Sequence, residues 1–137
     1  MAEGGAGALP TLEEALGWVG HRLDEIGGAS IARVQGVHVD ADSGEPAWLV
    51  VRLGRFGRIT ALPFRDCAAG AGHVWCPYER DEVRGAPSLE PDEPLTREQE
   101  LELCAHYGIG ERQARAAEIA ARGQGAQTAR PAVSPAA

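Results

Sequence analysis

Four arginines surround a predicted turn at residues 54–57 and form the most promising binding surface in the sequence. A basic rim with an aromatic side chain at its tip is typical of surfaces that contact RNA phosphates or acidic proteins. The competing interpretation is a solvated rim without a partner, because charged side chains usually face water. The rim consists of Arg52, Arg55, Arg58 and Arg65, with Phe56 at the tip of the turn.

One aspartate-rich turn resembles the start of a calcium-binding loop. Asp40, Asp42 and Gly44 have the spacing of the first positions of such a loop. The motif then requires Gly at its sixth position and Glu at its twelfth, where this chain has Glu45 and Val51. We therefore interpret the segment as a structural turn.

The histidines and cysteines lack the spacing that metal binding or nucleophilic catalysis requires. No histidine lies four residues from another histidine or from a cysteine, and no two cysteines form a Cys-x-x-Cys pair. Cys67 has no nearby base in the sequence. The sequence therefore predicts no catalytic residue, no metal and no cofactor. The residues concerned are His21, His38, His73, His106, Cys67, Cys76 and Cys104.

The composition indicates one globular domain that is acidic overall. A chain of 137 residues is long enough for one hydrophobic core. Its net charge of −7 disfavours a dominant nucleic-acid surface but leaves room for a local basic patch. Residues 78–104 contain nine acidic and three basic residues, a net charge of −6. This stretch is either a solvated face or an electrostatic docking surface.

The three cysteines and the absence of a signal peptide predict a reducing, cytoplasmic setting. The sequence also contains no apolar run near 18 residues. We therefore expect no membrane span.

A hairpin over residues 37–53 organises the predicted fold. Two β-branched, apolar runs flank a turn in which Gly44 can adopt a positive φ. Both faces of the second run are mainly apolar, so we expect both to be covered. One face consists of Leu49, Val51 and Leu53, and the other of Trp48, Val50 and Arg52.

Two covers are available for the face that carries Trp48. A capping box at Thr96 and Gln99 predicts a helix over residues 95–107, whose expected apolar stripe is Leu101, Cys104 and Tyr107. The helix would then lie across the sheet. The alternative is the same face of a second chain, which would make an isologous dimer.

The remaining pattern predicts short strands at roughly regular spacing, as in a small barrel or sandwich. We expect strands at 18–23, 30–39, 58–64 and 73–78, after a short helix capped by Thr11 and Glu14. The alternation within 30–39 slips at Gln35-Gly36, which predicts a bulge. The predicted inward residues are Ala32, Val34, Val37, Val39, Leu49, Val51, Leu53, Val74 and Cys76.

Several short segments together resemble the PRC-barrel domain family. Their order and spacing carry the resemblance over residues 18–109. The segments are Ile26-Gly27-Gly28-Ala29-Ser30-Ile31, Val37-His38-Val39-Asp40, Gly44-Glu45-Pro46-Ala47-Trp48-Leu49-Val50-Val51, Gly54-Arg55-Phe56-Gly57, Leu62-Pro63, Pro77-Tyr78 and His106-Tyr107-Gly108-Ile109.

This resemblance implies a mainly β protein: a small, bent PRC-type β-barrel that acts as an interaction module without a catalytic residue. We expect a short N-terminal helix and one or two C-terminal helices, the second at 110–122. The predicted organisation is a disordered tail at 1–10, the barrel at 11–86, a proline linker with a helical extension at 87–122, and a disordered tail at 123–137.

The leading functional hypothesis is therefore a non-enzymatic adaptor that binds another protein. An RNA- or ribosome-assembly-associated role is the alternative, and a homodimer is a further possibility. The candidate partner contacts are Trp48, Val50, Arg52, Arg55, Phe56 and Arg58.

Overall fold

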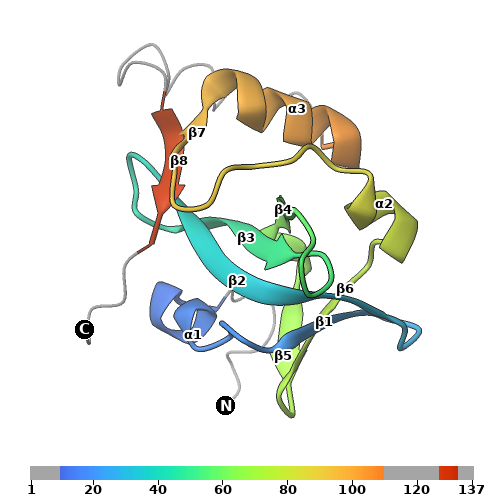
Figure 1. The fold of residues 1–137 in the computed structure, drawn as a ribbon. Helices are drawn as coiled ribbons and strands as arrows, with labels where there is room; N and C mark the ends of the chain where they lie inside the picture. Colours follow the sequence, from blue (N-terminus) through green and yellow to red (C-terminus); the bar gives the residue numbers. More distant parts are fainter. Residues whose placement is uncertain (1–9, 110–126, 133–137) are drawn as a thin grey trace.

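The computed structural model describes residues 10–109 and 127–132, and within these residues the chain is mainly β (Figure 1). The described strands are β1 (Arg22–Glu25), β2 (Ser30–Asp40), β3 (Pro46–Arg52), β4 (Ile59–Pro63), β5 (Ala68–Gly70), β6 (His73–Cys76), β7 (Leu95–Thr96) and β8 (Gln127–Pro131). The helices are α1 (Leu12–Leu16), a 3-10 turn η1 (Phe64–Asp66), α2 (Arg80–Arg84) and α3 (Arg97–Tyr107).

The strands form one sheet in the order β4-β3-β2-β1-β6-β5, with β8 paired to both β2 and β7. The β1–β6 pair is parallel and the other pairs are antiparallel. Among the described residues the end strands β4 and β5 do not pair, so the sheet is not closed into a barrel. Part of the outer edge of β4 is taken instead by a bridge between Ile59 and Leu89.

Strand β2 is the longest strand and contacts three others. One of its edges pairs with β3, and the other pairs with β1 near its start and with β8 near its end. The predicted bulge is confirmed, because the pairing with β3 shifts register between Val34 and Gly36. The extra residue bends β2, so the same strand pairs with β1 near its start and with β8 near its end.

Local signals in the sequence account for the turn between β2 and β3. Asp40 Oδ1 accepts hydrogen bonds from the backbone N–H groups of Asp42 and Ser43, at 2.8 and 2.9 Å. Gly44 has a φ of 76°, a conformation that glycine adopts without strain. This carboxylate therefore closes its own turn, as the sequence predicted.

Both predicted capping boxes are present. Thr11 and Glu14 cap α1, and Thr96 and Gln99 cap α3. Helix α3 ends at Gly108, whose φ of 69° is the left-handed conformation common after helices. The strand predicted at 18–23 is wrong at its start, because the chain turns through Gly20 and β1 begins at Arg22.

Strand β3 is buried on both faces, as predicted. Trp48, Leu49, Val50 and Val51 are all buried, and of the predicted inward residues Leu53 alone is half-buried. Figure 1 shows α3 over β3 and β4, while α1 lies below β2 on the opposite side.

Helix α3, rather than a second chain, covers Trp48. The indole Nε1–H donates a hydrogen bond of 2.5 Å to Oε2 of the buried Glu100. Tyr107 also donates from its hydroxyl to the carbonyl oxygen of Ala61 in β4, at 2.8 Å. Burial, and secondarily the Glu100 charge, raises the pKa of the Cys104 thiol to about 11.

The buried stripe of α3 lacks one predicted residue and contains two residues that were not predicted. It consists of Glu100, Leu103, Cys104 and Tyr107, whereas the predicted Leu101 is half-exposed. These positions have the i, i+3, i+4, i+7 spacing of one helix face. Sequence patterning rejects a glutamate at such a position, but the indole N–H of Trp48 supplies the partner that makes its burial possible.

The prediction of a disordered C-terminal tail is wrong at residues 127–131, because these residues form β8. Ala129 is fully buried and pairs with Asp40 of β2 on one side and Leu95 of β7 on the other. Pairing with two strands satisfies the backbone N–H and C=O groups of β8, although its sequence shows no strand pattern. Residues 1–9 of the tail predicted at 1–10, and the predicted helix at 110–122, lie outside the described residues.

Replacement of Glu100 tests the cover of Trp48. Glu100→Ala should lower the free energy of unfolding by about 1–3 kcal/mol, because the buried indole N–H loses its acceptor. Glu100→Gln is the matched control, since its amide oxygen can still accept the bond. Urea unfolding of both variants checks this, and an alanine variant within about 0.5 kcal/mol of the wild type would contradict it.

A second prediction concerns His38, which is buried beside β8. Burial lowers the pKa of His38 below 6.5, against smaller raising effects of the Arg130 backbone and the Asp92 charge. The unfolded chain therefore binds more protons than the folded chain just below pH 6.5, so stability is full above that pH and decreases as pH falls.

Urea unfolding between pH 7.5 and 5 should show this loss in the wild type and a smaller loss in His38→Gln, which cannot titrate. Parallel pH profiles for the two proteins would show that His38 does not contribute.

Candidate functional site: the arginine groove

A groove of about 720 Å³ lies over β1, β2 and the turn that follows β3. Its charged lining is entirely basic, and Ser30 and Gln35 add polar groups. We call it the arginine groove and define it by Arg22, Arg33, Arg52 and Arg55. A groove of this charge is unexpected on a chain with a net charge of −7.

Strand pairing places three of these arginines in a straight row across the sheet. Arg22 of β1 lies opposite Arg33 of β2, and Arg33 lies opposite Arg52 of β3. Directly opposite residues share a face, and neighbouring strands are about 4.8 Å apart. Like charges in this arrangement destabilise a sheet. We call Arg22, Arg33 and Arg52 the arginine row.

Neutral groups hold two members of the row. Arg33 Nη1 donates to the carbonyl oxygen of Gly20 at 2.6 Å. Arg52 donates from Nε to Gln35 Oε1 at 3.3 Å and from Nη1 to the carbonyl oxygen of Gly57 at 3.1 Å. These bonds orient the guanidinium groups but leave their charges uncancelled, so the groove attracts anions.

The remaining groove arginine lies at the exposed turn. The Arg55 guanidinium is 6.0 Å from the centre of the Phe56 ring, within the range of a cation–π contact. Phe56 itself is 91% exposed, the most exposed of the large apolar side chains that the structure describes. The basic rim predicted at this turn is therefore present at Arg52, Arg55 and Phe56.

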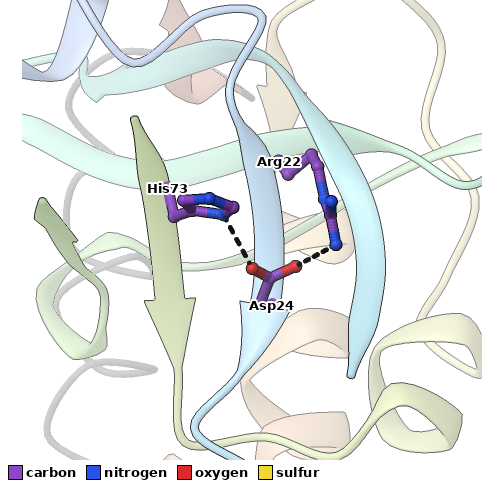
Figure 2. A network of polar contacts seen from close by, with 3 residues as sticks. All are labelled: Arg22, Asp24 and His73. Atoms are coloured by element: carbon purple, nitrogen blue, oxygen red, sulfur yellow. Dashed lines mark hydrogen bonds and ion pairs between the residues drawn. The ribbon is translucent and has the colours of Figure 1, made fainter. Parts of the chain in front are cut away.

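Arg22, at the other end of the row, is the member with an acidic neighbour. Its Nη2 is 3.6 Å from Oδ1 of Asp24, and the Arg22 side chain is 48% exposed. Asp24 is buried, and its other oxygen, Oδ2, is 3.0 Å from Nδ1 of His73 on β6. Figure 2 shows Asp24 on β1 between the two basic side chains.

Two of the predicted contact residues are unavailable for a partner. Trp48 and Val50 are buried, because α3 and the loop after α2 cover the face that we predicted as a partner contact. Arg58 remains exposed and also holds that loop: it donates to the carbonyl oxygens of Arg84 and Ala86 and to the Ser88 hydroxyl.

The sequence prediction missed Arg22 and Arg33. Arg33 could have been found, because a hairpin with a bulge at Gly36 places residue 33 opposite residue 52. Arg22 could not, since its position depends on where β1 begins. The predicted Arg65 is exposed but lies outside the groove.

The cysteines have the environment of structural residues. Burial raises the pKa of Cys67, and it raises the pKa of Cys76 to about 11. Such thiols remain protonated at neutral pH and are poor nucleophiles. Within residues 10–109 and 127–132, no three His, Cys, Asp or Glu side chains are grouped as a metal site would require.

The chain matches no protein-family profile, and it matches no curated protein. In the part of the chain that the structure describes, none of the helices has the length and apolar character needed to cross a membrane.

Proposed function

We propose that the protein is a non-enzymatic interaction module of the PRC-barrel type, which binds an acidic segment of a partner protein in the arginine groove. The observation that carries the proposal is the row of Arg22, Arg33 and Arg52 at directly opposite register positions. A row of like charges weakens the sheet unless a ligand supplies opposite charge. A carboxylate accepts two parallel N–H···O hydrogen bonds from one arginine guanidinium, which gives geometric specificity.

The shape and charge of the surface support a peptide-like ligand. The groove is open along three neighbouring strands and has backbone-anchored donors along its length. Phe56 at its end offers an exposed apolar ring next to Arg55, the combination common at protein interfaces. A partner segment that combines carboxylates with one apolar side chain fits both features.

RNA is the second candidate, and Phe56 is the observation that favours it. An exposed ring beside an arginine is also a platform on which an unpaired base can stack. The net charge of −7 repels any anionic ligand, but an RNA carries a phosphate at every nucleotide, whereas a protein segment can confine its carboxylates to the positions that face the groove. We therefore rank the acidic protein segment first.

The experiment measures fluorescence anisotropy of two labelled probes, an octaglutamate peptide and an octauridylate RNA, at low salt. We expect the peptide to bind more tightly. Arg33→Gln with Arg55→Gln should weaken peptide binding by about tenfold, since exposed ion pairs contribute about 0.2–1 kcal/mol each. Arg65→Gln is the matched control for loss of one exposed positive charge outside the groove.

Three outcomes would overturn the proposal. Peptide affinity that is equal in the wild type and the double variant would place binding elsewhere. Tighter binding of the RNA than of the peptide would make RNA the ligand. Concentration-dependent self-association that the double variant loses would make the acidic stretch at 78–104 of a second copy the occupant.

A further inference from the structure

The row of basic residues continues one strand beyond the arginine groove. In the parallel pairing of β1 with β6, His73 lies directly opposite Arg22. Arg22, Arg33 and Arg52 follow in register on β1, β2 and β3. An imidazole therefore occupies the fourth position of a row whose other three members are permanently charged.

Asp24 fixes which nitrogen of His73 carries a proton when the ring is neutral. Its carboxylate is an acceptor, so Nδ1–H donates the 3.0 Å bond to Oδ2 (Figure 2). The Asp24 side chain is 6% exposed and the His73 side chain 39% exposed, so the carboxylate is a fixed anchor beneath a ring that reaches water. In the neutral ring, Nε2 is consequently an acceptor and repels an anion. Protonation turns it into a donor.

The groups around the imidazole are few. On β1 they are Asp24 and Arg22, and the opposite residue on β5 is Gly70, which has no side chain to titrate. On β6 itself the Trp75 ring lies 6.2 Å away, nearly parallel to the imidazole. A carboxylate bound at this end of the row would therefore place a second negative charge opposite Asp24, with the ring between the two.

Arg22 is able to contribute to the same anion. Oδ1 of Asp24 makes no hydrogen bond, and its separation of 3.6 Å from Arg22 Nη2 is an ion pair without close contact. The guanidinium is therefore attracted by Asp24 but not locked to it. A ligand carboxylate can be bound by Arg22 and His73 together while Asp24 continues to hold the ring.

From this geometry we infer that His73 is the fourth anion-binding residue of the row, next to the groove, and that it takes up a proton when the acidic ligand binds. The inference rests on the proposed function. Ligand affinity at this end of the row then depends on pH. A ligand carboxylate accepts a hydrogen bond from Nε2–H of His73 only after a proton from solvent has been added to that nitrogen. Histidine is suited to this, because its side chain ordinarily titrates between pH 5 and 8.

The test is isothermal titration calorimetry of octaglutamate binding at pH 7 in two buffers with different ionisation enthalpies, HEPES and Tris. The dependence of the observed enthalpy on the buffer gives the number of protons taken up per peptide. We expect net uptake by the wild type, and an affinity that increases severalfold from pH 8 to pH 6.

His73→Gln is the decisive variant, because its amide can still donate to Asp24 but cannot be protonated. It should bind the peptide with little proton uptake and a flatter pH profile. His106→Gln, which removes a histidine on α3 that contacts the Glu82 carbonyl, should behave like the wild type.

The two possible failures are distinguishable. Wild-type peptide binding with no proton uptake, or equal uptake by His73→Gln, would overturn the role of His73 and leave the groove intact as a site. Absence of peptide binding at every pH would overturn the proposed function and this inference together.

Discussion

Burial of both faces of β3 is the constraint on which the rest of the structure depends. Trp48 and Val50 on one face, and Leu49 and Val51 on the other, need two separate covers. Helix α3 supplies the cover for Trp48 through Glu100, a buried bond that requires the helix to sit at one place on the sheet. Once β3 is fixed, its pairing with the bulged β2 sets Arg33 opposite Arg52, so the core packing also determines the groove.

The arginine row opposes the stability that this packing provides. Directly opposite like charges are unfavourable, and the groups that hold Arg33 and Arg52 are neutral. Solvation alone does not explain why three cationic side chains lie at directly opposite positions on an acidic chain. The proposal of an anionic ligand resolves this conflict, since a bound carboxylate segment would turn repulsion into attraction. Asp24 offsets the charge at one end and anchors His73 there.

The sequence predicted the features that depend on neighbouring residues. The Asp40 turn, both capping boxes and the bulge at Gly36 each need only a few adjacent side chains, and all are present. Features that depend on distant pairing were missed: Ala129 belongs to a segment without strand pattern and is ordered by β2 and β7. The loop contacts of Arg58 were also missed, because sequence shows a charge but not the backbone carbonyls that accept from it.

The most direct test of the account is a paired measurement on Arg33→Gln, the variant that removes the central charge of the row. Thermal unfolding and binding of an acidic peptide should be measured on the same preparation. We expect peptide binding to weaken while the melting temperature stays equal to that of the wild type or rises, because repulsion from Arg22 and Arg52 is relieved. A melting temperature that falls by several degrees with peptide affinity unchanged would show that Arg33 is structural, and would contradict the account.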